Sequence, residues 1–480
     1  MLNSLISLIK HYKSNPEKVV FKDQNRSYSY KYIYSNVFEY SKVLKNNKKL
    51  NIGIFGNNSV EYAIADCGIS TTKHTMVPIP SFFNDDTIAN IIKDSNIDLI
   101  FTDQVNFTRI KSIFKNTNLF IKSLSVNSKT LELFNHKRII YTSGTTNKPK
   151  GVIQSDKQMN IAIKNLINTF NIQSKDTYLS LLPISTLLEQ ICSIHITLQA
   201  NSLSIFNEDI SKRIFSLKED DLNFILYSKP NFLCISPIIL KQLVNYLEKN
   251  TFDDFTKNIK SICVGGSKSS IDVLNRGINH LKLPIFEGYG LSEFCSVVSV
   301  NNQHFNKIGT TGAILPNIKC KIINGEIVLS GPTLMNGYYP NKIQTDEFYT
   351  GDLGSLSKEG FLTVYGRKDD VLILDNGRNI HPEYIKQLLV DKINYKEIYI
   401  YQDDNNDLCF AISLKDNDLK KNLINFIKSI LPEYILPKKI YVLGKNFDQK
   451  QLLSTNGKVN SAKISNYLNL NKGEITNAIL

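Results

Sequence analysis

Residues 51–103 read NIGIFGNNSVEYAIADCGISTTKHTMVPIPSFFNDDTIANIIKDSNIDLIFTD, and their pattern sets the fold class. NIGIFGNN is typical of a buried strand that ends in a Gly/Asn turn, and VEYAIADCGIS has helical spacing of its apolar residues. MVPIP predicts a second strand, TIANIIKDSN a second helix and IDLIFTD a third strand. Strands that alternate with helices form βαβ units, so we expect a largely parallel sheet.

The alternation continues through the middle of the chain. RIIYTSGTTNKPKG predicts a strand that runs into a loop, and SDKQMNIAIKNLINTF behind it predicts a helix with Ser155 as its N-cap. KPNFLCISPIILKQLVNYLEK and KSICVGGSKSSIDVLNRGINH each repeat the order of strand, turn and helix. From Lys307 the chain becomes rich in glycine and short strands, which favours a small, mostly antiparallel unit.

The charged run GRKDD at residues 366–370 marks a boundary. Beyond it, EIYIYQ, LCFAISL and KKIYVLG are typical of strands, and KKNLINFIKSIL of a helix. We therefore expect an α/β protein with a large N-terminal domain, residues 1–366, of parallel-rich sheets with helices. Residues 307–366 would be a small antiparallel subdomain within it, and residues 367–480 a small, mobile α+β C-terminal domain.

Composition narrows the function classes. The 480 residues exceed one usual hydrophobic core, and 42% apolar and 21% charged residues are ordinary globular values. The net charge of +13 could indicate an anionic partner, but the lysines are scattered, so nucleic-acid binding is not expected. Seven cysteines without a CxxC pair predict neither a disulfide framework nor a zinc site and suit a cytoplasmic protein.

Membrane insertion and secretion are not expected either. The opening MLNSLISLIKHYK has only a short apolar run before Lys10 and predicts an amphipathic helix rather than a signal peptide. No later segment has the apolar length of a transmembrane helix.

The loop YTSGTTNKPKG at residues 141–151 has the composition that polyphosphate binding needs. Its glycines and small hydroxyl residues let backbone N–H groups approach anionic oxygens, and its lysines supply charge. It lacks the G-x-x-x-x-G-K-[ST] spacing of a Walker A loop, and taken alone it could equally be a solvated turn. However, YTSGTTNKPKGV resembles the signature loop of the adenylate-forming, or AMP-binding, superfamily, which includes acyl-CoA synthetases. The resemblance assigns ATP binding to Thr142, Ser143, Gly144, Thr145, Thr146 and Lys150.

Further motifs of this superfamily follow in its order. Gly265, Gly266 and Ser267 resemble the turn on the adenine side of the nucleotide. EGYGLSE resembles the GYGxTE motif with Ser in place of Thr, and it adds these candidate nucleotide-binding residues: Glu287, Gly288, Tyr289, Gly290, Ser292 and Glu293. The resemblance implies that Tyr289 stacks on adenine, that Ser292 contacts the α-phosphate, and that Glu293 holds Mg²⁺ together with Thr145.

Four more segments complete the resemblance, which spans nearly the whole chain. YTGDLG at residues 349–354 resembles the motif whose aspartate, here Asp352, binds the ribose hydroxyls. In GRKDD, Arg367 would reach ribose or phosphate oxygens and Asp369 would be the hinge. NGRNIHPEY resembles the next motif, in the small domain, and contains His381, which we interpret as a structural or surface residue because no base or metal partner is visible. LLSTNGKVN places Lys458 where the superfamily has its catalytic lysine, although Leu452 stands where many relatives carry proline.

The resemblance implies an ATP-dependent acid–thiol ligase of the acyl-CoA synthetase type, with Thr145, Glu293 and Lys458 as its catalytic residues. ATP and Mg²⁺ would convert a small-molecule carboxylic acid into its acyl-AMP, and CoA would accept the acyl group. LLPISTLLEQ resembles the segment that lines the acyl tunnel of fatty acyl members, with Thr186 in place of a usual His or aromatic residue. A fatty or other apolar acid is therefore expected, although the same segment could be plain core.

Two alternatives stay open. The enzyme could load an acyl carrier protein instead of CoA, although the chain has no carrier domain of its own. The chain could also be a nucleotide-binding scaffold without catalysis, which the joint presence of Thr145, Glu293, Asp352, Arg367 and Lys458 argues against.

Overall fold

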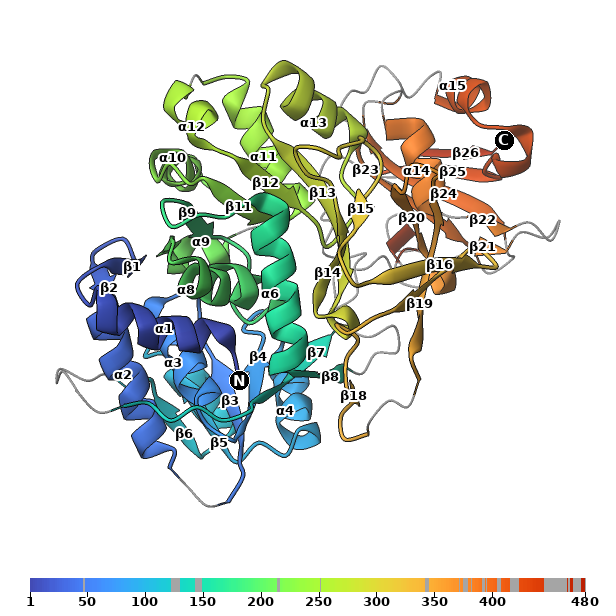
Figure 1. Cartoon of the computed structure of the whole chain (residues 1–480). Coiled ribbons are helices and arrows are strands. Elements are labelled where there is room, and N and C mark those ends of the chain that lie inside the picture. Colours follow the sequence, from blue (N-terminus) through green and yellow to red (C-terminus); the bar gives the residue numbers. More distant parts are fainter. Residues whose placement is uncertain are drawn as a thin grey trace.

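The structure is a computed structural model that describes residues 1–45, 48–121, 130–142, 149–213, 216–250, 252–341 and 345–370, together with the stretches 372–373, 379–380, 382–390, 393, 395–403, 407–414, 423–443, 464, 467–468 and 476–479. Within these residues the chain forms two large sheets with helices and three smaller sheets (Figure 1). This is the α/β architecture that the alternating pattern predicts, with the antiparallel and the C-terminal α+β parts following it in the expected order.

The seven-stranded sheet contains the alternating stretch that begins at Asn51. Its order is β18-β8-β7-β4-β3-β5-β6, and β3 is parallel to both β4 and β5. The strands are β3 (Asn51–Phe55), β4 (Thr75–Ile79), β5 (Leu99–Thr102), β6 (Thr117–Leu119), β7 (Lys137–Thr142), β8 (Lys150–Ser155) and β18 (Gly337–Tyr338). All five residues of β4 are buried, as expected for a strand covered on both faces.

The nine-stranded sheet takes up most of the middle of the chain. Its order is β15-β14-β13-β12-β11-β9-β10-β1-β2, and the strands from β1 to β13 in this order are parallel. The strands are β1 (Val19–Lys22), β2 (Ser27–Ser29), β9 (Thr177–Ser180), β10 (Leu203–Phe206), β11 (Phe232–Ile235), β12 (Ser261–Val264), β13 (Ile285–Leu291), β14 (Ser296–Val300) and β15 (Ala313–Ile314). The carboxyl ends of β11, β12 and β13 therefore lie side by side.

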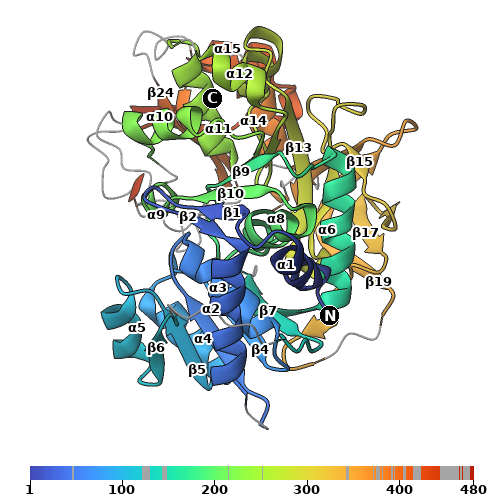
Figure 2. The same ribbon diagram turned by 60° about the vertical axis from the view of Figure 1, so that its left-hand side comes forward.

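Helices connect the strands and separate the two large sheets. Figure 2 shows α1, α6 and α8 between the strands of these sheets. Helix α6 begins after Ser155, whose side chain forms a capping box with Gln158, so the predicted N-cap is confirmed. The helices of this part are α1 (Asn3–Ser14), α2 (Tyr30–Val43), α3 (Val60–Ser70), α4 (Asp85–Asp94), α5 (Phe107–Ile113), α6 (Asp156–Phe170), α7 (Leu187–Glu189), π-helix η1 (Gln190–Ile196), α8 (Thr197–Ala200), α9 (Glu208–Lys212), α10 (Glu219–Tyr227), α11 (Pro237–Leu247), α12 (Asp253–Asn258), α13 (Ile271–Asn275), π-helix η2 (Arg276–His280) and 3₁₀ helix η3 (Ser292–Phe294).

Smaller sheets follow toward the C-terminus. An antiparallel sheet of order β16-β17-β19-β20 is made of β16 (Lys319–Ile323), β17 (Glu326–Ser330), β19 (Glu347–Leu356) and β20 (Leu362–Arg367). The remaining elements are η4 (Lys368–Asp370), β21 (Leu372–Ile373), β22 (Asn379–Ile380), α14 (Pro382–Val390), β23 (Tyr395–Gln402), β24 (Leu408–Leu414), α15 (Leu423–Ile430), η6 (Glu433–Ile435), β25 (Lys439–Val442) and β26 (Thr476–Ile479). The last sheet has the order β23-β24-β25-β26.

Two details differ from the sequence interpretation. The segment after the phosphate loop is a strand, β8, antiparallel to β7, so the loop closes a hairpin instead of leading directly into α6. Within residues 307–366, β15 joins the nine-stranded sheet and β18 joins the seven-stranded sheet. The predicted domain boundaries, residues 1–366 and 367–480, stay predictions.

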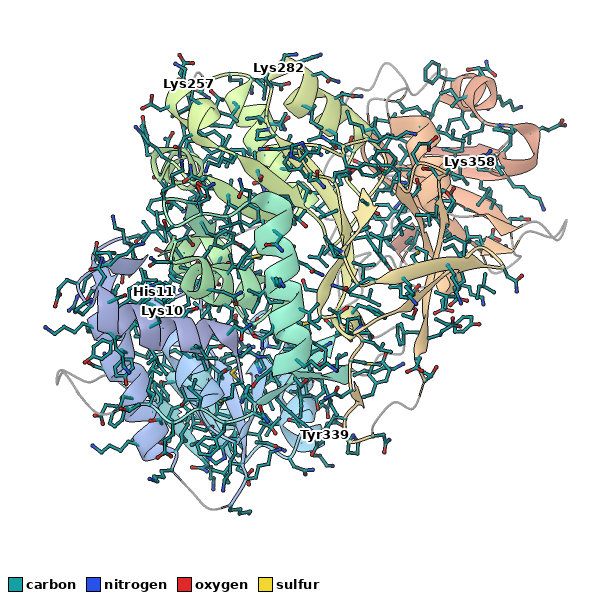
Figure 3. The ribbon with its side chains drawn as sticks, in the orientation of Figure 1. Lys10, His11, Lys257, Lys282, Tyr339 and Lys358 are labelled. Atoms are coloured by element: carbon teal, nitrogen blue, oxygen red, sulfur yellow. The ribbon has the colours of Figure 1, made fainter. Side chains whose placement is uncertain are left out.

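The basic side chains are spread over the surface. Figure 3 labels Lys10, Lys257, Lys282 and Lys358, which point outward from widely separated elements, and all four are exposed. They do not gather in one patch. In the described part of the chain, no helix combines the length and apolar character needed to cross a lipid bilayer.

Candidate active site

The predicted phosphate loop joins strands β7 and β8. Thr142 ends β7 and is the register partner of Lys150, which begins β8. Ser143, Gly144, Thr145 and Thr146 lie outside the described residues. The ammonium of Lys150 lies 5.5 Å from the centre of the Tyr338 ring, on the neighbouring strand β18.

The two glycine motifs lie next to each other because their strands are parallel neighbours. Gly265 and Gly266 follow β12 directly, and Val264 at its end pairs with Glu287 in β13. A Cβ atom added to Gly265 would lie 3.2 Å from the carbonyl oxygen of Gly288. Gly266 has a φ of +87°, a conformation that glycine adopts without strain. Ser267 and Glu287 complete the two motifs.

Ser267 is exposed, whereas the carboxylate of Glu287 turns back toward the same end of the sheet. Its Oε1 accepts a hydrogen bond from the backbone N–H of Ser269 at 3.3 Å. Burial raises the pKa of Glu287 above its ordinary value. Glu287 therefore holds the turn that carries Ser267.

Tyr289, Asp352 and Arg367 form one hydrogen-bonded group. The Tyr289 hydroxyl donates to Oδ2 of Asp352 at 2.5 Å, and Nη1 of Arg367 donates to Oδ1 of the same carboxylate at 3.2 Å. Asp352 and Arg367 are register partners in β19 and β20, and Arg367 also donates to the Thr350 carbonyl at 2.7 Å. Burial, and then the Asp352 charge, raise the pKa of Tyr289 far above its usual range. Its ring is thus held with a neutral hydroxyl.

The next residues of the EGYGLSE motif are held by the hairpin that carries the loop. Gln154 of β8 donates from its side chain to the Ser292 carbonyl at 2.6 Å. The Tyr338 hydroxyl donates to Oε1 of Glu293 at 2.7 Å, and the Met335 N–H donates to the Glu293 carbonyl at 2.7 Å. The structure therefore places Glu293 beside the strand that leaves the phosphate loop.

The remaining predicted residues are only partly within the described chain. Asp369 lies in η4, with Oδ2 3.8 Å from Nη2 of Arg367. Lys458 and His381 lie outside the described residues. The roles of all these residues stay predictions, and the described ones come from both large sheets, from β19 and β20 of the four-stranded sheet, and from the short helices η3 and η4.

A largely apolar cavity of about 230 Å³ opens beside this group. Gly265, Gly266, Tyr289 and Ser292 form part of its lining, so the cavity adjoins both glycine motifs. Its other walls come from α6, α7, η1, β11, β12 and β14. The cavity can therefore hold an apolar group next to whatever binds the glycine motifs.

One wall of the cavity comes from the segment LLPISTLLEQ. Thr186, Leu187 and Leu188 line it, and Phe170 and Phe232 face them with ring centres 5.3 Å apart. The segment predicted to contact the acid therefore does border a cavity. It runs into the π-helix η1, and π-helical turns are frequent where a helix is shaped around a ligand site.

A family model described as AMP-binding enzyme matches residues 9–339. The chain belongs to the AMP-binding enzyme family. Residues from Thr142 to Tyr338 of the candidate site fall within this match. The superfamily that the sequence motifs indicate is therefore confirmed.

This AMP-binding enzyme is also similar to individual curated proteins. It is 28% identical over 334 residues to a 2-succinylbenzoate–CoA ligase of Listeria monocytogenes, with 66% of this chain and 68% of that protein covered. It is 27% identical over 343 residues to a 2-succinylbenzoate–CoA ligase of Bacillus cereus, with 65% and 68% covered.

Solved structures show the same fold. A structure described as the anthranilate CoA ligase AuaEII in complex with anthranoyl-AMP matches with a TM-score of 0.82 at 16% identity, covering 98% of each chain. An O-succinylbenzoate coenzyme A synthetase from Bacillus subtilis in complex with ATP and magnesium ion matches with a TM-score of 0.80 at 20% identity, covering 96% of this chain and 99% of that one. The expected fold is therefore confirmed over nearly the full length.

The site of this AMP-binding enzyme includes residues that the sequence did not single out. Tyr338 contacts both Glu293 and Lys150 through strand pairing over a long sequence distance. Cys192, Cys234 and Cys263 line the cavity, although their spacing follows no motif. The sequence features next to them are the run GYY at residues 337–339 and the position of Cys263 two residues before Gly265.

Proposed function

We propose that the chain is an AMP-forming acid–thiol ligase that joins a carboxylic acid to CoA in two steps. In the first step, a carboxylate oxygen attacks the α-phosphorus of ATP and pyrophosphate leaves, which gives an acyl-AMP. In the second step, the CoA thiol attacks the acyl carbon and AMP leaves, which gives the thioester. The single observation that carries the proposal is the apolar cavity that opens directly beside the Gly265 turn and Tyr289. The named relatives, all CoA ligases, support it.

The first step must bring two negative groups together, so neutralising charge dominates its chemistry. We assign the triphosphate to the Thr142–Lys150 loop, whose backbone N–H groups and lysine would face the phosphate oxygens. Asp352 would accept hydrogen bonds from the ribose hydroxyls, and Arg367, which donates to Oδ1 of Asp352, would orient that carboxylate. Ser292 would contact the α-phosphate, and Tyr289 would lie along the base.

Glu293 fits the predicted magnesium site. Its carboxylate accepts from the neutral Tyr338 hydroxyl at Oε1, and it forms no ion pair with a described residue, so its second oxygen is available to a metal ion. Mg²⁺ prefers oxygen ligands and is usually held by one or two carboxylates together with substrate phosphates. Glu293 and Thr145 would hold the ion, which when bound supplies positive charge to the phosphate oxygens.

We assign the second cation of the first step to Lys458, which would bridge the acid's carboxylate and the α-phosphate. The C-terminal domain, residues 367–480, would then turn about Asp369 and admit the thiol. Lys458→Ala should lose acyl-AMP formation while keeping thioester formation from supplied acyl-AMP. Equal loss of both half-reactions would contradict this division of labour.

For the acid, we propose an apolar one. The cavity walls are mostly aliphatic and aromatic, which suits an acid that leaves water on binding. The curated relatives are named for 2-succinylbenzoate, an aromatic acid, so an aryl acid is as well supported as the fatty acid that LLPISTLLEQ suggests. CoA is the proposed acceptor because these relatives are CoA ligases by name, and nothing in them supports a carrier protein.

The proposal is tested by acid-dependent exchange of labelled pyrophosphate into ATP across a panel of carboxylic acids. Exchange that appears only with an acid present is expected. Nucleotide binding without exchange for every acid would instead favour a non-catalytic scaffold. Thioester formation measured with CoA and with an acyl carrier protein then identifies the acceptor.

A further inference from the structure

Three cysteine side chains line the cavity, and Cys263 lies two residues before Gly265, on the strand side of the glycine turn. Cys234 in β11 and Cys263 in β12 are register partners on adjacent parallel strands, so their side chains project to the same face. Cys192 comes from η1 on the other side, and its Sγ lies 3.6 Å from the Sγ of Cys234. All three side chains line the cavity. We call Cys192, Cys234 and Cys263 together the thiol floor.

No charged side chain lines the cavity within the part of the chain that the structure describes. Its polar side chains are hydroxyls and thiols, among them Thr186 and Ser292. Two ionisable pairs adjoin the wall. Tyr289, which lines the cavity, donates to Asp352, and Glu189, which follows Leu188, accepts at Oε2 from the Tyr178 hydroxyl at 2.8 Å. Neither Glu189 nor Asp352 would supply positive charge to an anion placed in the cavity.

The buried cation Arg138 is already paired with a carboxylate outside the cavity. Arg138 donates from both Nη atoms to Asp66, at 2.9 and 3.2 Å, and both residues are fully buried. Arg138 does not line the cavity. A negative charge at the end of an acid's tail would therefore meet apolar groups and thiols without a counterion.

The cavity is also small. A cavity of about 150 Å³ is known to accommodate a benzene molecule. The present cavity, of about 230 Å³, therefore has room for one ring with a few more atoms, or for a short alkyl chain. A long fatty tail would need to displace the thiol floor.

We propose that the thiol floor restricts this enzyme to monocarboxylic acids with a compact, uncharged tail, and that Cys192, Cys234 and Cys263 set the length of that tail. The inference rests on the proposed acid–thiol ligase function and refines its substrate class. It separates this chain from its named relatives, because 2-succinylbenzoate carries a second carboxylate. In this cavity that carboxylate would be buried without a partner, which is strongly unfavourable.

The test uses the full-length enzyme and pyrophosphate release with matched pairs of acids. Hexanoate and adipate have the same chain length and differ only in a terminal carboxylate, and benzoate and phthalate form the aromatic pair. We expect kcat/KM for each monocarboxylate to exceed that of its dicarboxylate partner by roughly 100-fold. Hexadecanoate should be activated far more weakly than hexanoate.

Equal activation of adipate and hexanoate, or efficient activation of 2-succinylbenzoate, would overturn the inference while leaving the proposed function in place. If no acid of the panel stimulated pyrophosphate release, the proposed function would fail, and the inference with it. The two failures are therefore distinguishable.

Variants of the floor test the length limit. Cys263→Ala should raise the ratio of octanoate to hexanoate activity, and Cys263→Met should lower it, each by about tenfold. The matched controls are Cys320→Ala and Cys320→Met, because Cys320 is likewise partly buried but lies in β16 outside the cavity. Ratios of two substrates on one variant are insensitive to a loss of folded protein. An unchanged ratio in both Cys263 variants would refute the floor as the length determinant.

Discussion

Replacing Arg138 by methionine should cause a large loss of stability, because its guanidinium in β7 pairs with the buried carboxylate of Asp66. Arg138 is 1% exposed and donates to Asp66, which is 0% exposed, to the Gln190 amide oxygen at 2.6 Å and to Ser70 at 3.2 Å. Nη2 also lies 3.0 Å from Nε2 of His195. Methionine keeps most of the stem volume but removes the guanidinium partner of the buried Asp66 carboxylate, which keeps only His195, with Nε2 3.2 Å from Oδ1. Loss of that partner should cost about 3–5 kcal/mol.

The consequence is measured as the free energy of unfolding in urea, followed by far-ultraviolet circular dichroism because the chain contains no tryptophan. The matched control is Arg276→Met, whose side chain is 24% exposed and pairs with Glu248 and Asp272 at the surface. That change should cost at most about 1 kcal/mol, since surface ion pairs contribute little. Combining Arg138→Met with Asp66→Asn should recover part of the loss. A cost for Arg138→Met no larger than that of the control would refute the reasoning.

Three further predictions concern the site. Tyr338→Phe removes the hydrogen bond to Glu293 and should weaken magnesium-dependent ATP binding by about tenfold in calorimetry. Tyr339→Phe, at the partly buried neighbouring residue labelled in Figure 3, should not weaken it, and equal affinities for both variants would count against the Tyr338 contact. Gly290→Ala should lower stability by about 1–3 kcal/mol or prevent folding, since its Cβ would lie 1.8 Å from a backbone oxygen of β14, and an unchanged melting temperature would contradict this. Burial raises the pKa of Glu189 to about 8, so the folded state keeps a proton that the unfolded state loses above about pH 4.3, and stability should fall as pH rises between these values. Glu189→Gln should flatten that dependence in urea midpoints, and an identical slope in both proteins would show that Glu189 is not its source.

Much of the fold could be predicted because its signals are local. The strand and helix alternation from Asn51 to Asp103 depends on side-chain period and turn residues alone, and each predicted element is present. Ser155 caps α6 as expected because a capping box needs only residues three positions apart. The hairpin was not predictable because the lysines and glycines around residue 150 are typical of a loop, although the strand β8 begins at Lys150.

The candidate site was predictable only where a contiguous motif carried it. EGYGLSE and YTGDLG identify Tyr289 and Asp352, and the structure joins them by a hydrogen bond. The contact between Tyr338 and Glu293 and the meeting of the three cysteines depend on which strands become neighbours. The spacing of residues in the sequence does not determine which distant strands pair, so these contacts are not predictable from the sequence pattern.

Each of the two large sheets includes strands from distant parts of the chain. Strands β1 and β2, near the N-terminus, complete the edge of the nine-stranded sheet beside β10, and β18 completes the seven-stranded sheet beside β8. During synthesis, each sheet therefore has an open edge until a much later residue has left the ribosome, and open edges pair readily with other chains. The nine-stranded sheet is complete only after Ile314 and the seven-stranded sheet only after Tyr338, so fragments that end before these residues should aggregate instead of folding.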